Sequence, residues 1–411
     1  MHLGHEMASK LKYYWPVLLL AGLKFVAYFV YGPISSYDSK EYFLAANILL
    51  ENTEWMYDAG LDKAAISHTI FRPLGYPFLI AFLQWILGTH VEHFIVLLQL
   101  VVSIAAFKKL YDLLGELYGE TLFPALIIIL LSLTTSWLFD IYVLTDSFMA
   151  SFYIYLFSAL GSSLLRKELP SMGHSLLLGI MMACMVYLRG NGHVFCLTLV
   201  PLILSLFYFS TGRKIQRGMI FALIILPAAI SYEGYRQWNY MRTGEAILTT
   251  GGQTVMFQPL FTLASRGVPV FESDSVVDRT VKEVKRNDYS INDVLALNEA
   301  LFEQEQWSAL EIQKVAYAKY IDTWRLFPGE MSQLALSKFE SQKQRLLLNP
   351  LSLADILYSE QMGKHYFPGV GKFLRALPSF PPLGFVLFGI AFLVSKLQNY
   401  ESAEVSRRMQ G

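Results

Sequence analysis

The sequence predicts an all-α protein that crosses a membrane several times. Of its 411 residues, 54% are hydrophobic and only 16% are charged, whereas a soluble globular domain carries about 25% charged residues. Apolar runs of about 20 residues recur along the chain, and each could cross a hydrocarbon core of about 30 Å as a helix. Together with a mean hydropathy of +0.39, these observations indicate a polytopic helical membrane protein.

About eight transmembrane helices are expected from runs of this length. They lie at approximately 13–31, 92–111, 121–138, 144–165, 173–189, 193–210, 218–236 and 379–396. The first run is too long for the core of a signal peptide and lacks a small-residue cleavage site, so we expect it to be retained. The run 75–88 is too short to cross and is predicted to form an interfacial helix.

Lysine and arginine residues in the short connections predict the orientation, because cytoplasmic loops carry an excess of both. With eight alternating spans, these basic groups all fall on one side of the membrane: Lys10 and Lys12, Lys108 and Lys109, Arg166 and Lys167, Arg213, Lys214 and Arg217, and Lys396, Arg407 and Arg408. The expected location is the plasma (inner) membrane, crossed several times, with both termini in the cytoplasm.

The chain divides into three predicted parts. Residues 1–236 form a transmembrane module that includes the first outer loop, 32–91, and residues 237–378 form a helical segment on the outer face. Residues 379–411 hold the last transmembrane helix and a cytoplasmic tail. Within the first outer loop, the polar stretch 33–77 is expected to be irregular.

Amphipathic patterns predict helices at 291–303 and 308–327, and Pro328 opens a third that ends near residue 348. In the second helix, four residues spaced by four form one apolar face: Ile312, Ala316, Tyr320 and Trp324. We expect these helices to pack on the outer membrane face or on the first loop rather than to form an independent domain.

Several classes of partner and site lack support in the composition. The formal net charge is zero, and no basic nucleic-acid-binding pattern occurs, so no nucleic acid is expected as a partner. The two cysteines, Cys184 and Cys196, lie in apolar runs and are interpreted as packed thiols. No metal-binding motif occurs; a divalent cation is compatible with the sequence but not required by it.

Two acids lie at one predicted membrane face. Asp38 follows the first apolar run by a few residues, and Asp146 opens the fourth. Each is explained as a helix cap or turn residue, since Asp is common there, and Thr145 competes with Asp146 for the cap. Alternatively, the carboxylates converge on one outer cavity, where proton transfer or metal-assisted glycosyl transfer would use them. Both interpretations stay open.

Arg72 and Arg189 lie on the predicted outer side, where short loops are usually poor in basic residues. One interpretation is that they snorkel to lipid headgroups or pair with a nearby acid. The other is that they clamp a phosphate, because a planar guanidinium with several donors matches phosphoryl oxygens.

Other charged residues have simpler interpretations. Lys24, inside the first run, is expected to extend its stem to the interface. Asp140 is expected to be a solvated loop acid. Glu233 and Arg236, three residues apart, are expected to pair.

Several of these features recur in a known order. The first loop carries an acid followed by Tyr and Ala, it closes on an Arg-Pro-x-Gly-Tyr-Pro element, and a second acid opens the fourth span. The residues are Asp38, Tyr42 and Ala45; Arg72 to Pro77; Asp146; Gly179, Ala183 and Arg189 in the fifth span; and Trp238 to Gly244 after the seventh. In this order they resemble the GT-C superfamily of integral-membrane glycosyltransferases, in the branch of protein O-mannosyltransferases and lipid A aminoarabinose transferase. The resemblance covers residues 10 to about 250.

The resemblance implies a polyprenyl-phosphate-linked sugar as donor. It implies that Asp38 is catalytic and that Arg72 and Arg189 hold the donor phosphate, and we add Asp146 as a second catalytic candidate. The family often has a glutamate directly after the first acid, whereas here Ser39 follows and Glu41 is the nearest second carboxylate. The candidate substrate-binding set is Arg72, Arg189, Tyr42, Tyr76, Glu41 and Asn191.

The expected function is therefore transfer of a sugar to an acceptor hydroxyl on the outer face of the membrane. The acceptor is a protein, a lipid or a glycan. A polymerase or ligase of polyprenyl-linked glycans is an alternative, although its key basic residues would be expected in the largest outer loop. A transporter of lipid-linked substrates is another, and it would favour midplane charges and an inverted repeat.

Overall fold

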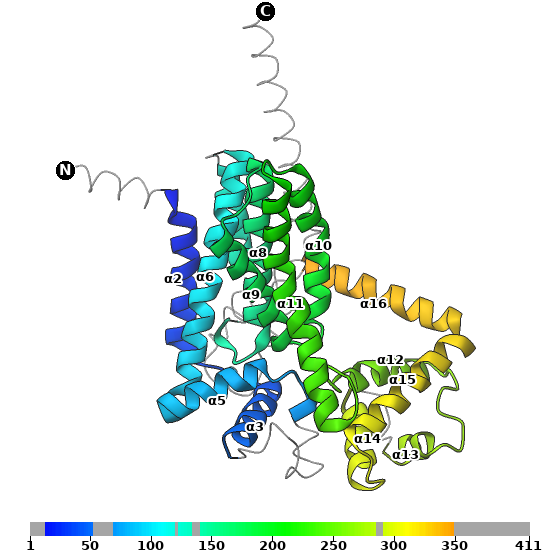
Figure 1. The fold of residues 1–411 in the computed structure, drawn as a ribbon. Helices are drawn as coiled ribbons and strands as arrows, with labels where there is room; N and C mark the ends of the chain where they lie inside the picture. Colours follow the sequence, from blue (N-terminus) through cyan, green and yellow to red (C-terminus); the bar gives the residue numbers. More distant parts are fainter. Residues whose placement is uncertain (1–12, 52–68, 120–121, 134–139, 285–290, 349–411) are drawn as a thin grey trace, which may run out of the picture.

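The structure is a computed structural model, and it describes residues 13–51, 69–119, 122–133, 140–284 and 291–348. In this part of the chain, every element is a helix apart from one isolated β-bridge. Figure 1 shows a bundle of upright helices, with further helices gathered at one end of it. The all-α prediction is confirmed.

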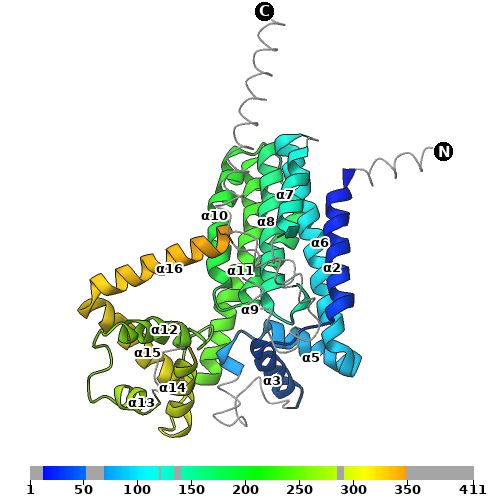
Figure 2. The ribbon, with the colours of Figure 1, turned by 180° about the vertical axis from the view of Figure 1, so that it is seen from behind.

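Among the described residues, four helices are long and apolar enough to cross a membrane: α6 (Val91–Tyr118), α8 (Thr145–Arg166), α10 (Gly192–Phe209) and α11 (Lys214–Thr243). The apolar helices α2 (Trp15–Tyr31) and α9 (Met172–Leu188) are shorter, with 17 residues each. At 1.5 Å per residue each covers about 26 Å. The helix α7 (Leu122–Leu133) packs against α2 and α6 in the bundle, which Figure 2 shows from behind. The four long helices are those expected of a membrane protein; the predicted span 379–396 lies outside the described residues.

The bundle is held together by lengthwise packing of helix pairs. Helix α9 packs along α11, α6 packs along α8, and α2 packs on α6. The main hydrophobic core lies among these helices and extends to α3 (Tyr37–Glu51) and α5 (Gly75–Leu87) at the end of the bundle. The short 3-10 helix η2 (Gly88–His90) joins α5 to α6.

The prediction of an irregular loop over 33–77 is wrong for α3. Four residues of this segment, Tyr42, Ala45, Ala46 and Leu49, recur at i, i+3, i+4 and i+7 and are buried. They form an apolar face on the side where α3 packs against α5. Helix α5 has 13 residues, in agreement with the prediction that this run is too short to cross.

The remaining helices form what we call the α12–α16 cluster: α12 (Gly252–Ser265), α13 (Val276–Val284), α14 (Ile291–Glu303), α15 (Ala309–Leu326) and α16 (Pro328–Leu348). The three predicted helices are confirmed, and Ile312 and Ala316 of the predicted apolar face are buried. They pack against residues of α12, α13 and α14 in a hydrophobic core separate from that of the bundle. This core was not expected, because it depends on which amphipathic helices pair with one another.

Candidate functional site

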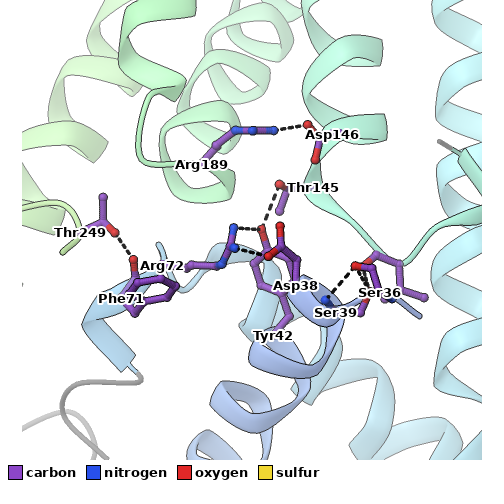
Figure 3. A network of polar contacts seen from close by, with 11 residues as sticks. Ser36, Asp38, Ser39, Tyr42, Phe71, Arg72, Thr145, Asp146, Arg189 and Thr249 are labelled. Atoms are coloured by element: carbon purple, nitrogen blue, oxygen red, sulfur yellow. Dashed lines mark hydrogen bonds and ion pairs between the residues drawn. The ribbon is translucent and has the colours of Figure 1, made fainter. Parts of the chain in front are cut away.

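The two predicted acids are placed by one short contact between distant segments. Ile34 and Tyr142 form a parallel β-bridge, in which the Ile34 amide donates to the Ile141 carbonyl over 2.9 Å. The Val143 amide donates in turn to the Ile34 carbonyl over 3.0 Å. Helices α3 and α8 begin three residues beyond the two bridging residues. The bridge therefore brings the first turns of α3 and α8 to one site (Figure 3).

Capping does not account for either acid. At the start of α3, the Ser36 amide donates to the Ser39 hydroxyl over 2.8 Å, and the Ser39 amide donates to the Ser36 hydroxyl over 3.3 Å. The Ser39 hydroxyl donates in turn to the Val143 carbonyl over 2.8 Å. Asp38 and Asp146 are each the second residue of a helix and turn their carboxylates to arginines (Figure 3). The first turn of a helix favours a negative side chain, since its N–H groups lack partners within the helix.

Asp38 belongs to a network centred on Arg72. The Nη2 atom of Arg72 donates to Asp38 Oδ1 over 2.6 Å, and Nη1 donates to the Tyr42 hydroxyl over 3.2 Å. The Tyr42 hydroxyl lies 3.2 Å from the Thr145 hydroxyl, so the network links α3 to the start of α8. The side chains of Arg72 and Asp38 are 29% and 48% exposed, so both charged groups face an open space.

Asp146 forms the second pair, with Arg189 (Figure 3). Arg189 ends α9, and its carbonyl accepts a hydrogen bond of 2.8 Å from the amide of Gly192, which closes a tight turn into α10. The side chains of both members of the pair are 42% exposed. Pairing with a nearby acid, one of the two interpretations of each arginine, is therefore what the structure contains.

The other candidate residues differ in their access to this site. Tyr76 is fully buried, donates to Gln99 over 2.8 Å, and meets the Tyr42 ring edge-on with centroids 5.0 Å apart. It supports Tyr42 and does not reach the open space. Glu41 is half-buried on α3, and Asn191 is exposed where α10 begins, two residues beyond Arg189.

Two predictions about charged residues are wrong. Lys24 is fully buried and forms an ion pair with Asp140, which is itself 3% exposed. Lys24 also donates to the Ser103 hydroxyl over 2.9 Å, and the Ser147 hydroxyl donates to Asp140. The lysine does not need to reach the interface because a carboxylate distant in sequence neutralises it inside the protein.

The predicted pair of Glu233 and Arg236 is confirmed, with a separation of 2.8 Å.

An apolar cavity of about 750 Å³ is lined by residues that include close sequence neighbours of the charged site. Helices α5, α6, α8, α9 and α11 contribute to its wall, which includes Leu98, Val102, Phe152, Cys184, Tyr235 and Trp238. Leu74, Phe148 and Leu188 also line it. Leu74 lies two residues after Arg72, Phe148 lies two residues after Asp146, and Leu188 directly precedes Arg189. The cavity and the charged site are therefore neighbours.

Gly75 explains how the cavity wall closes near Arg72. A Cβ atom at this position would lie 2.6 Å from both the Cβ and the carbonyl oxygen of Tyr187. Only a residue without a side chain allows the start of α5 to approach the end of α9 so closely.

In the part of the chain that the structure describes, the fold and the site define a helical protein with four helices long and apolar enough to cross a membrane. Two acid–arginine pairs lie at one end of the bundle, and residues adjoining them in sequence line an apolar cavity. Among the described residues, no group of three or more His, Cys, Asp or Glu side chains could hold a metal ion. Comparison of the chain with protein-family models, curated proteins and solved structures finds no match.

Proposed function

We propose that the protein is a GT-C-type glycosyltransferase of the plasma membrane. It transfers a sugar from a polyprenyl-phosphate donor to an acceptor hydroxyl on the outer face. One observation carries the proposal: two arginines, each paired with a partly exposed acid, lie within two residues of side chains that line an apolar cavity. A polyprenyl phosphate has the matching chemistry, with a long apolar chain for the cavity and an anionic head for the arginines.

The pairs leave the arginines able to change partner. An ion pair of partly exposed side chains contributes only about 0–1 kcal/mol, whereas phosphate oxygens offer a guanidinium stronger, bidentate hydrogen bonds. When Arg72 turns to the donor phosphate, the Asp38 carboxylate becomes available as a proton acceptor. Donor binding thus prepares the base.

In the proposed reaction, the acceptor oxygen attacks the anomeric carbon of the donor sugar while its proton passes to Asp38. The bond between that carbon and the phosphate oxygen breaks, and polyprenyl phosphate leaves. Arg72 and Arg189 stabilise the charge that develops on the phosphate in an oxocarbenium-like transition state. Attack from the side opposite the phosphate inverts the anomeric centre. Asp146, beside Arg189, positions the acceptor.

Cys184 offers a direct test of the lipid site, because it lines the cavity whereas Cys196 is 6% exposed. In a Cys196→Ala variant in nanodiscs, saturating undecaprenyl phosphate is expected to slow labelling of Cys184 by monobromobimane. The physical reason is that the lipid chain occupies the space the reagent must enter. The labelling rate is followed by fluorescence.

Inorganic phosphate serves as the control and is expected to leave the labelling rate unchanged. Equal rates with and without undecaprenyl phosphate would remove the cavity from the donor site. Protection by lipid without release of polyprenyl phosphate from any donor sugar, together with movement of that lipid between leaflets, would favour a transporter.

A further inference from the structure

The connection between α11 and α12, residues 244–251, holds the segment that carries Arg72. The Thr250 amide donates to the Ile70 carbonyl over 2.8 Å, and the Gly251 amide donates to the Phe71 carbonyl over 3.0 Å. The Thr249 hydroxyl also donates to the Phe71 carbonyl (Figure 3). Two consecutive carbonyls directly before Arg72 are therefore fixed by three consecutive residues of the connection.

The same threonine touches the turn that carries Arg189. A Cβ atom at Gly190 would lie 2.5 Å from the Thr249 Cγ2 atom but 3.6 Å from its Cβ. Gly190 is thus in close contact with the Thr249 methyl group. Rotation of the Thr249 side chain to relieve pressure on this methyl would also move the hydroxyl away from the Phe71 carbonyl.

The connection is itself fixed from two sides. From α15, the Gln313 side-chain amide donates to the Thr249 carbonyl over 3.2 Å, and Lys314 pairs with Glu245 over 2.5 Å. From α11, the Asn239 amide donates to the Ile247 carbonyl over 2.9 Å. Arg242, 4% exposed, donates to the Thr69 hydroxyl over 3.2 Å. The α12–α16 cluster is therefore connected by hydrogen bonds to the residues that precede Arg72.

We infer that Thr249 is a positioning residue for both arginines: its hydroxyl sets Arg72 through Phe71, and its methyl sets Arg189 through Gly190. That the two arginines bind the phosphate of a polyprenyl donor rests on the proposed function. The coupling of the two segments does not.

The test is a substitution and its rescue. Gly190→Ala places a methyl group against the Thr249 methyl, so either the Arg189 turn or the Thr249 hydroxyl must move. Thr249→Ser removes only the methyl and keeps the hydroxyl, so the double variant Gly190→Ala/Thr249→Ser restores the packing. Gly173→Ala is the matched control, because a Cβ there meets no atom within 4 Å.

The first readout needs no ligand. Hydrogen–deuterium exchange of the Thr250 and Gly251 amides is expected to accelerate in Gly190→Ala and to return to the wild-type rate in the double variant. Thr249→Val keeps a methyl but loses the hydroxyl, and it is expected to accelerate the same amides without a clash at Gly190. It provides the same information if Gly190→Ala does not fold.

The second readout is binding of undecaprenyl phosphate in nanodiscs. Gly190→Ala is expected to bind about 10–100-fold more weakly, as for loss of hydrogen bonds to a charged group, and the double variant is expected to recover wild-type affinity. Wild-type exchange rates in both Gly190→Ala and Thr249→Val, or failure of Thr249→Ser to rescue Gly190→Ala, would overturn the inference. If the wild type binds no polyprenyl phosphate, the proposed function fails, and the exchange rates alone decide the coupling.

Discussion

Replacing Asp38 with asparagine is expected to slow sugar transfer by about 10²–10⁴-fold, the usual contribution of a general base. The amide keeps the shape of the carboxylate but cannot accept the proton of the acceptor hydroxyl. Donor binding is expected to survive or to tighten, because Arg72 no longer shares its charge with an acid 2.6 Å away. Release of polyprenyl phosphate from a panel of donor sugars gives kcat and KM separately.

Arg72→Ala and Glu116→Gln give the comparisons for this experiment. Removal of Arg72 is expected to weaken donor binding, since it removes the guanidinium that we assign to the phosphate. Glu116 also pairs with an arginine, Arg166, but α8 carries Arg166 at the end opposite Asp146, so Glu116→Gln is expected to retain full activity. Full turnover in Asp38→Asn would show that the base is another group, with Asp146 the next to be tested.

Asp140→Asn is expected to destabilise the protein by about 3–5 kcal/mol, because it leaves the buried Lys24 ammonium without its counter-charge. Lys24 is fully buried, and Ser103 is its other hydrogen-bond partner. The measurement is thermal unfolding in detergent. The double variant Lys24→Met/Asp140→Leu removes both charges and is expected to approach or exceed wild-type stability.

Asp322→Asn is the matched control, because it breaks an ion pair with Arg325 whose members are 59% and 75% exposed. Such a pair is expected to change stability by less than about 1 kcal/mol. If Asp140→Asn melted like this control, the Lys24–Asp140 pair would not stabilise the bundle.

Local sequence patterns predict much of this fold. The pattern over 308–327 depends only on residues three and four apart, and the helix observed there, Ala309–Leu326, differs by one residue at each end. The apolar face over Tyr42 to Leu49 has the same spacing, but because polar residues surround it, the segment was predicted to be irregular rather than helical. Period and length are properties of a short segment, which is why they can be seen without knowledge of the rest of the chain.

The charged site was only partly predictable for a related reason. Asp38, Asp146, Arg72 and Arg189 stood out as charges beside apolar runs, and the structure brings all four to one site. Which acid pairs with which arginine depends on contacts across 34 and 43 residues of sequence. The Lys24–Asp140 pair spans 116 residues, and nothing near either residue indicates the other. Thr249 was missed because a threonine in a Gly/Thr-rich stretch looks like ordinary loop.

The bridge between Ile34 and Tyr142 fixes one end of each connection that leads into α3 and α8. The number of residues in each connection, more than their identity, therefore determines where the acid that follows it lies. Asp38 lies four residues after Ile34, and Asp146 lies four residues after Tyr142. Inserting one residue between the bridge and either helix would shift that carboxylate by one position relative to the bridge. A substitution in either connection leaves this spacing from the bridge unchanged, whereas an insertion or deletion of a single residue would displace one of the acids.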